Sequence, residues 1–303
     1  MTDTNIYFGR PGSLFTIPHP KGEFGASRQR LLDVFELGAG GARIDQMVGG
    51  SRVYVIPYEG MPRTTWALLQ AFADGHEGPG PFALLDPGQR NMLPANVSAA
   101  TSVTNGVDNF SIAGSGCVIA SSALYTDAGP RSAAWTFNNG FPTTGAALSV
   151  DWPSSTFRYG VPVVSGRALT FSCYVRGGGT DAIVTYTPRI FWRDASGVLT
   201  GTATSGTPVA SASGAFAQMF ATATPPAGAV YADMDIRYTS GVSAGSVGYF
   251  RRFMLNEGST PDTAWMPGTG VWPVKVIGLE ESWLGRFPDY RTGVGFAVRE
   301  DTS

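Results

Sequence analysis

Residues 168–197, ALTFSCYVRGGGTDAIVTYTPRIFWRDASG, contain two of the clearer strand signals of this chain. Two runs rich in β-branched and aromatic residues, 168–176 and 182–193, are separated by the cluster Arg176-Gly177-Gly178-Gly179. A second turn signal, Asp194-Ala195-Ser196-Gly197, ends the later run. Because β-branched and aromatic residues favour strands and Gly, Asp and Ser favour turns, this stretch predicts two short strands between tight connections.

The same pattern of short strand signals between turn residues extends in both directions from this stretch. From residue 96 to residue 268 the chain is rich in Ser, Thr, Ala and Gly, and further strand signals lie at 215–223, 229–238 and 247–255. Short strands that recur at this spacing between turn residues are typical of a β-sandwich. We therefore expect residues 96–268 to form a jelly-roll sandwich.

The flanking segments have a different pattern. A short helix is predicted from Pro62 to the residues before Gly75, because Pro favours the first turn of a helix and Gly the position past its end. Strand signals occur at 52–56 and 82–85 before the insert, and at 274–279 and 292–299 after it. Two strands alone do not make a stable domain. The sequence therefore predicts a mainly β fold, with a discontinuous domain, 1–95 plus 269–303, interrupted by the sandwich.

The stretch from Leu31 to Leu37 alternates only weakly and runs into Gly38-Ala39-Gly40-Gly41. We read the glycines as a flexible loop tip. They lack the Lys-Ser/Thr of a phosphate-binding loop.

Composition excludes several classes of protein. Hydrophobic residues make up 43% of the chain and charged residues 15%, which argues against intrinsic disorder. The net charge is −2 with no basic run, so neither nucleic acid nor an anionic membrane is an expected partner. The chain contains 40 Gly and 21 Pro, which suits short strands with many turns and disfavours long helices.

The N-terminal residues and the number of cysteines indicate where the chain is made. Met1-Thr2-Asp3-Thr4 has neither a basic nor an apolar signal region, and no apolar run is long enough to span a bilayer. We expect cytoplasmic synthesis without membrane insertion. Cys117 and Cys173 are too few for a disulfide scaffold or a zinc cluster. They are read as small buried apolar residues, and a single bridge between them is left open.

The insert resembles carbohydrate-binding-module-like jelly rolls. Such modules commonly close on an acidic-Gly pattern followed by Thr-x-Trp-x-Pro-Gly, and here Asn256-Glu257-Gly258-Ser259 is followed by Thr263-Ala264-Trp265-Met266-Pro267-Gly268. Similar pieces lie at 170–176, 191–197 and 224–229, and the entry at Asn91-Met92-Leu93-Pro94 also fits. The resemblance covers most of residues 91–268 and implies a sugar-binding sandwich.

The flanks resemble the belt domain of distal tail or minor tail proteins of long-tailed phages, especially actinobacteriophages. The features that carry this resemblance are the helix with Trp66, the strand Gly80–Pro87 and the two strands after Trp272. It implies a homo-oligomeric ring, expected to be a hexamer, with the tail tube and other tail-tip proteins as partners. The location it implies is the virion, after assembly in the host cytoplasm.

No catalytic residue is predicted. Gly241-Val242-Ser243-Ala244-Gly245 matches a hydrolase elbow in letters, but a strand signal follows it and the two histidines, His19 and His76, lie upstream. A nucleophilic serine of that type needs a following helix and a later histidine. The stretch is interpreted as a Gly/Ser hairpin loop, and the chain is expected not to be an enzyme.

Metal binding has one weak candidate. Asp233 and Asp235 alternate on one strand face, with Asp127 or Glu257 as further oxygen donors, and oxygen ligands suit calcium. The competing interpretation is two solvated carboxylates, since no calcium-loop spacing is present. No cofactor is expected apart from such a structural calcium ion.

Aromatic residues of the insert are the candidate glycan-binding residues, because sugar rings pack on flat aromatic faces and exposed aromatic patches mark binding sites. For each one, packing in the core is the competing and more common role. The candidates are Trp135, Trp152, Tyr159, Tyr174, Tyr186 and Trp192.

Three functions follow from these observations. The leading hypothesis is a structural ring adaptor between the tail tube and the tip complex. The second is host recognition, in which the insert binds cell-wall glycan and the ring supplies avidity. The third, a cell-wall polysaccharide hydrolase, lacks a nucleophile or a paired set of acids.

Overall fold

The protein is described by a computed structural model over residues 6–17, 25–37, 41–85, 91–101, 103–104, 110–114, 116–125, 131–140, 146–150, 157, 159–181, 183–239, 241–268, 270–271, 273–284 and 291–300. The chain divides into two compact units. Unit 1 contains residues 1–10, 14–86 and 272–303, and unit 2 contains residues 11–13 and 87–271. The sequence placed these boundaries after residue 95 and before residue 269. The expected fold class is confirmed: the protein is mainly β and its sheets are antiparallel.

Unit 1 is built on one sheet with the strand order β2-β1-β5-β18-β19-β4-β3. Its first strands, β1 (Ile6–Arg10), β2 (Ser13–Ile17) and β5 (Phe82–Leu85), lie at one side. The C-terminal strands β18 (Pro273–Leu284) and β19 (Arg291–Glu300) occupy the middle, and β4 (Gly41–Met61) and β3 (Gly25–Leu37) form the other side. The last segment of the chain therefore completes a sheet begun by the first.

The insertion of unit 2 follows from a pairing inside this sheet. Strand β5 ends just before unit 2, and β18 begins just after it. These two strands are neighbours, with Val274 opposite Phe82 and Pro273 opposite Ala83. Chain ends that lie side by side tolerate an inserted domain, so the sheet of unit 1 is continuous despite the interruption in sequence.

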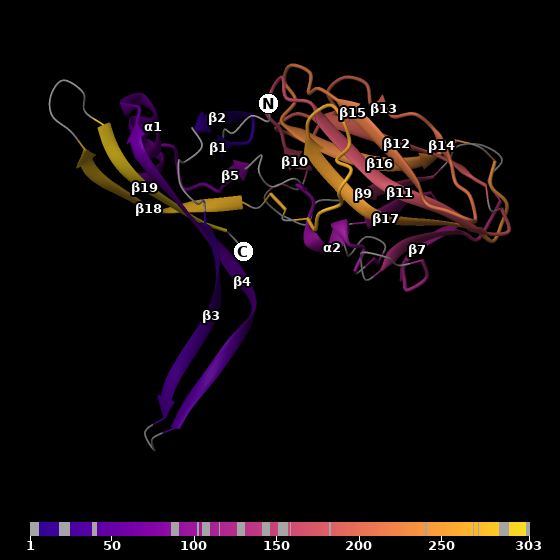
Figure 1. The fold of residues 1–303 in the computed structure, drawn as a ribbon, viewed down its shortest axis with the longest axis horizontal. Coiled ribbons are helices and arrows are strands. Elements are labelled where there is room, and N and C mark those ends of the chain that lie inside the picture. Colours follow the sequence, from indigo (N-terminus) through magenta and orange to yellow (C-terminus); the bar gives the residue numbers. More distant parts are fainter. Residues whose placement is uncertain are drawn as a thin grey trace. The chain divides into compact units, whose positions relative to one another are not determined.

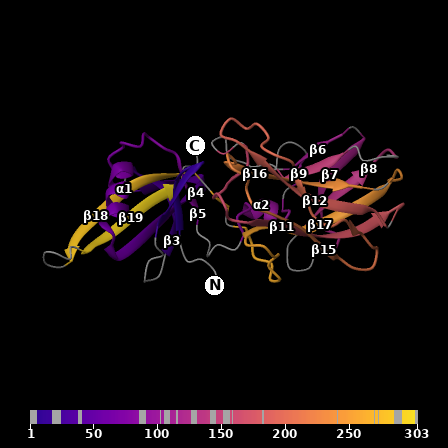
Figure 2. The same ribbon diagram turned by 90° about the horizontal axis from the view of Figure 1, so that it is seen from above.

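Helix α1 (Arg63–Ala73) packs on strands β18 and β19 (Figure 2). Pro62 precedes its first turn with φ −58° and ψ 137°, and Gly75 follows it at φ +78°, a left-handed conformation that glycine adopts without strain. Leu69 and Phe72 are the buried residues of the helix. The start and end signals predicted from the sequence are those that the structure uses.

Phe8 lies at the centre of the unit 1 core. Its ring is 5.0 Å from that of Phe296 on β19, 5.1 Å from that of Phe72 on α1, and 5.6 Å from that of Phe82 on β5. The contacts with Phe72 and Phe296 are edge to face, and such contacts add to the stabilisation from burying aromatic area. One residue of the first strand thus joins the helix to the middle of the sheet.

Strands β3 and β4 extend beyond the sheet as a two-stranded ribbon (Figure 1). Strand β19 pairs with β4 only between Val53 and Met61, whereas β3 pairs with β4 from Gly25 to Leu37. At 3.2–3.4 Å per residue, the ten residues from Arg28 to Leu37 reach about 30 Å. The sequence predicted only weak strand character here. Of the predicted loop tip at 38–41, residues 38–40 lie outside the described residues and Gly41 is the first residue of β4.

Unit 2 is a sandwich of two antiparallel sheets. One sheet has the order β13-β12-β16-β9-β6, with β10 beside β16 and β14 beside β12. Its strands are β6 (Phe110–Ala113), β9 (Ala147–Val150), β10 (Val161–Pro162), β12 (Thr185–Arg193), β13 (Thr204–Ser205), β14 (Val209–Ala210) and β16 (Tyr231–Tyr238). We call it the β12 sheet.

The second sheet of unit 2 has the order β15-β11-β17-β8-β7 and is called the β11 sheet. Its strands are β7 (Cys117–Ser122), β8 (Ser132–Phe137), β11 (Leu169–Gly179), β15 (Ala217–Ala223) and β17 (Ser246–Glu257). A single-turn helix, α2 (Ala95–Ser98), contacts β17.

Aromatic rings from both sheets form the core between them. Trp135 and Phe250 come from the β11 sheet, and Tyr186 and Tyr238 come from the β12 sheet. The ring centres of Tyr186 and Phe250 are 5.0 Å apart, and those of Trp135 and Tyr238 are 6.1 Å apart. All four residues are fully buried. Burial of this much apolar area is the main stabilising term for the sandwich.

Candidate functional site

The outward side of the β11 sheet carries a cluster of tyrosines and arginines. In an antiparallel pair, residues directly opposite each other share a face. Tyr174 lies opposite Arg251, and Arg176 lies opposite Tyr249. We call this surface the arginine–tyrosine face; it consists of Tyr125, Tyr174, Arg176, Phe216, Tyr249, Arg251 and Arg252.

A β-bulge brings both neighbouring arginines to this face. The β11–β17 register shifts between Ser172 and Tyr174, so that two residues of β17 are accommodated opposite Cys173. Arg252 has φ +55° at this point, and its guanidinium lies over the Tyr174 ring, 5.5 Å from the centre. Strict alternation would have placed Arg252 on the opposite face from Arg251.

Tyr125 covers the other end of the face from the segment that follows β7. Its ring lies 3.8 Å from the Arg176 guanidinium and meets the Tyr249 ring edge to face at 4.9 Å. Arg251 Nη1 donates a hydrogen bond to the Tyr125 carbonyl oxygen at 3.3 Å. These contacts hold Tyr125, which is 39% exposed, against the sheet.

The remaining ring of the face is also stacked under an arginine. The Arg251 guanidinium lies 3.5 Å from the centre of the Phe216 ring. Burial raises the pKa of Tyr249 above its ordinary value, and the neighbouring Tyr125 raises it further. Tyr249 is therefore a neutral phenol that can donate a hydrogen bond at any physiological pH. The face combines flat apolar rings with hydrogen-bond donors, which is the chemistry a sugar chain requires.

Of the candidate glycan-binding residues that the structure describes, Tyr174 alone lies on this face. Trp135 and Tyr186 are fully buried between the sheets and Trp192 is 3% exposed, so these three pack in the core and present no ring to a ligand. Tyr159 packs against Tyr231, with ring centres 6.0 Å apart, and belongs to the β12 side of the sandwich. Trp152 lies outside the described residues.

The outward side of the β12 sheet has a different character, with opposite charges in pairs. Arg189 lies opposite Asp235 and binds both carboxylate oxygens, through Nε at 2.7 Å and through Nη2. Arg193 binds Asp233 through Nε at 3.0 Å and Nη2 at 2.7 Å. The two aspartates named as weak calcium candidates are therefore each bound to a guanidinium group in this structure.

No group of three His, Cys, Asp or Glu side chains in the described parts of the chain could hold a metal ion. Asp127, the proposed extra ligand, lies outside those parts, and Glu257 pairs with Arg167 at 3.5 Å. Among the described helices none is both long enough and apolar enough to cross a membrane.

The structure shows the surroundings of Ser243 and of the two cysteines. The Ser243 backbone amide donates to Asp181 at 2.5 Å, and the segment leads directly into strand β17. The expected hairpin is wrong, because the segment connects β16 of the β12 sheet to β17 of the β11 sheet and these two strands do not pair. Cys117 and Cys173 are both free thiols, and burial raises the pKa of each.

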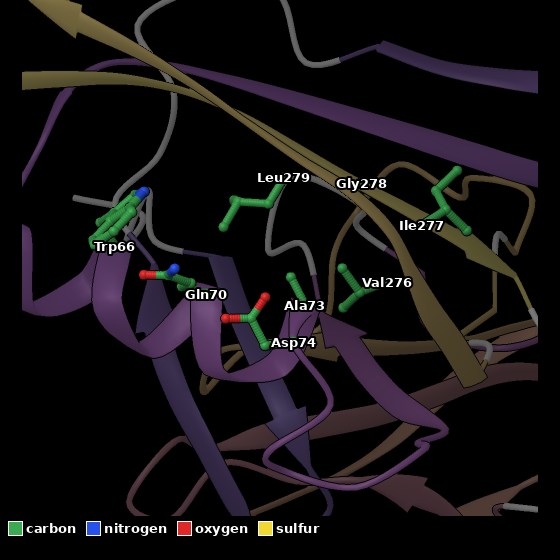
Figure 3. Close-up of a pocket in the computed structure, with 8 residues that line it drawn as sticks. All are labelled: Trp66, Gln70, Ala73, Asp74, Val276, Ile277, Gly278 and Leu279. Carbon is green, nitrogen blue, oxygen red and sulfur yellow. The ribbon is translucent and has the colours of Figure 1, made fainter.

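Unit 1 contains a separate groove of about 340 Å³ between α1 and β18 (Figure 3). Trp66, Gln70 and Asp74 line it from the helix, and the bulged stretch Val276–Leu279 lines it from the strand. Trp66 Nε1 is buried and has no hydrogen-bond partner among the described residues.

No protein-family model matches the chain, and no curated protein is similar to it. Among solved structures, the CBM22-1 xylan-binding domain of Paenibacillus barcinonensis Xyn10C is 12% identical, with a TM-score of 0.35 over 53% of this chain and 92% of that one. The TmCBM61 structure in complex with β-1,4-galactotriose is 14% identical, with a TM-score of 0.36 over 56% of this chain and 99% of that one.

A third solved structure is the enzymatically active domain of tailspike protein 4 of bacteriophage CBA120. It is 14% identical, with a TM-score of 0.39 over 57% of this chain and 22% of that one. Likenesses of this size say nothing about ligand, activity or assembly.

Proposed function

We propose that the chain is a structural protein of a phage tail tip, in which unit 1 assembles into a ring and unit 2 projects as a carbohydrate-binding domain. The observation that carries the assembly is the β3–β4 ribbon. From Arg28 to Leu37 on β3, the only described pairing partner is β4. An isolated two-stranded hairpin is marginally stable in water. The ribbon therefore gains its stability by packing against another subunit.

The sheet of unit 1 also supports assembly. Strand β3 lies at one end of the strand order and β2 at the other. Edge strands offer unpaired N–H and C=O groups to a second chain. A head-to-tail contact that repeats from copy to copy closes into a ring when the rotation allows it. A hexamer is the form we expect, with the tail tube and tip proteins on its two faces.

Electron microscopy and native mass measurement of the full chain test this assembly. We expect closed rings. The matched variant replaces residues 30–50 by an Asn-Gly turn, which keeps Gln29 opposite Ser51 and removes the ribbon. It should be a monomer with the same unfolding transition for unit 2. A full chain that stays monomeric at its highest soluble concentration, or a trimmed variant that still forms rings, would contradict the proposal.

The observation that supports carbohydrate binding is the arginine–tyrosine face. It gathers Tyr125, Tyr174 and Tyr249 on one side of the β11 sheet, where no described strand covers them. Several weak sites on one ring act together and raise the overall affinity. Affinity electrophoresis in gels containing host cell-wall polysaccharide should retard the full chain, and Tyr174→Ala should lose most of that retardation. We propose that the chain has no catalytic activity. Release of sugar from cell-wall material by the purified chain would contradict this.

A further inference from the structure

The side chain of Glu300 lies at the point where the β3–β4 ribbon leaves the sheet of unit 1. The described pairing between β19 and β4 ends with Arg299 opposite Val53, and the same register would next place Glu300 opposite Arg52. The Arg52 backbone amide donates to Glu300 Oε2 at 3.0 Å. A side-chain carboxylate therefore accepts the β4 amide at which the ribbon begins.

Two further groups of β4 donate to the same carboxylate. Arg52 Nε and the Tyr54 hydroxyl each lie 3.0 Å from Glu300 Oε1. The Glu300 side chain is 5% exposed and that of Arg52 is 16% exposed. Hydrogen bonds between charged groups are stronger than neutral ones, and water and salt screen a buried pair only weakly. Glu300 thus joins the end of β19 to the two residues of β4 that flank Val53.

The ribbon is irregular just beyond this point. The β3–β4 register shifts between Arg30, which lies opposite Gly50, and Leu32, which lies opposite Gln46. A bulge bends the strand that contains it and increases the local twist. Figure 1 shows the ribbon changing direction after it leaves the sheet. We call residues 28–30 and 50–52 the root of the ribbon, and residues 32–37 and 41–46 its outer part.

We propose that Glu300 holds the root of the ribbon in line with the sheet, so that the outer part reaches a neighbouring subunit in one direction. A two-stranded ribbon twists more freely than a larger sheet, so its own pairing sets its direction poorly. Loss of the carboxylate deprives the Arg52 amide and guanidinium of a buried acceptor, which loosens the root. This rests on the ring assembly proposed above and names the residue that orients the assembling ribbon.

Distances between spin labels in single subunits test the orientation before assembly. Cysteines replace Arg43 in the outer part and the exposed Arg63 of α1. Cys117→Ala removes the partly exposed thiol, while Cys173 is fully buried. The chain is diluted until native mass measurement shows single subunits. Glu300→Gln keeps the size of the side chain and removes its charge, and it should make the distance distribution about twofold wider.

Control variants separate orientation of the ribbon from a general loss of structure. Tyr54→Phe removes one of the three donors and should widen the distribution less than Glu300→Gln does. Glu77→Gln changes an exposed glutamate of unit 1 and should have no effect. Labels at Arg63 and at the exposed Lys275 report on the body of the sheet and should show no change. Widening of this second pair as well would mean that Glu300 merely stabilises the sheet, which would overturn the inference.

The yield of rings in electron microscopy gives the second readout. Glu300→Gln should form about tenfold fewer rings than the unchanged chain at equal concentration, whereas Glu77→Gln should assemble normally. An unchanged label distance in Glu300→Gln, or a normal yield of rings, would overturn the inference and leave assembly through the ribbon intact. If the unchanged chain forms no rings, the proposed assembly fails, and the label distances still decide whether Glu300 orients the ribbon.

Discussion

Asn91 Nδ2 lies 2.8 Å from the carbonyl oxygen of Met266, so one buried side chain joins the two ends of unit 2. The same nitrogen lies 3.0 Å from the carbonyl oxygen of Phe253. Asn91 Oδ1 accepts from the backbone amides of Leu93 and Leu255, each at 3.2 Å. The residue is 1% exposed.

Asn91→Ala should lower the free energy of unfolding of unit 2 by about 3 kcal/mol, because buried amides and carbonyls lose their partner. Chemical denaturation followed by near-ultraviolet circular dichroism measures the change. Asn138→Ala, at an exposed turn, is the control and should be neutral. A loss of stability no larger than that of the control would show that Asn91 does not fasten the two ends.

Gly268 is expected to tolerate no side chain. A Cβ atom there would collide with the carbonyl oxygen of Leu93, which already accepts a hydrogen bond from the Gly270 amide at 2.9 Å. Gly268→Ala should destabilise unit 2 by about 1–3 kcal/mol, the usual cost of overpacking. Gly214→Ala meets nothing within 4 Å and should change stability little. Equal effects of the two substitutions in a thermal melt would refute this account.

Arg252 should combine strain with function. Arg252→Gly and Arg252→Ala both remove the guanidinium, but only glycine relieves the positive φ of +55°. The glycine variant should therefore be about 1 kcal/mol more stable than the alanine variant, while both bind host cell-wall polysaccharide more weakly. Urea denaturation and affinity electrophoresis on the same samples give the two readouts. An alanine variant as stable as the glycine variant would mean that the bulge stores no strain.

The Arg189–Asp235 ion pair should affect the stability of unit 2 because both side chains are largely buried. The side chains are 13% and 8% exposed, and removing one partner leaves a poorly solvated charge. Asp235→Ala should cost about 3 kcal/mol, whereas Arg189→Met with Asp235→Leu should cost much less. Calcium should leave the melting temperature unchanged in each protein. Stabilisation by calcium that disappears in Asp235→Ala would restore the metal-site interpretation.

Much of the fold could be predicted from short-range signals. Phe82–Leu85 was predicted as a strand and is β5, and the helix lies between Pro62 and Gly75 as expected. These signals depend on few neighbouring residues. The β3–β4 ribbon was predicted only in part, because 52–56 carries a clear strand signal whereas Leu31 to Leu37 alternates weakly and the glycines at 49 and 50 resemble a loop. Its pairing depends on register between strands, which local composition does not contain.

The site was harder to predict than the fold. Trp135 and Tyr174 both stand on strands of the β11 sheet, yet one is fully buried and the other is not. Which side of a strand faces the core depends on where the second sheet packs, and the sequence of the strand alone does not give this. The adjacent arginines at 251 and 252 would alternate in a regular strand, and only the bulge opposite Cys173 brings them together. The arginine–tyrosine face therefore depends on a β-bulge that residue patterns do not signal.

The fastening of Asn91 to Met266 has an evolutionary consequence. The two ends of this sandwich are held together by its own buried hydrogen bonds. The domain into which it is inserted therefore needs only two neighbouring strands, here β5 and β18, at which the chain leaves and returns. Recombination between such genes would exchange the whole of unit 2, and with it the surface proposed to bind a glycan, while the sheet of unit 1 stays the same.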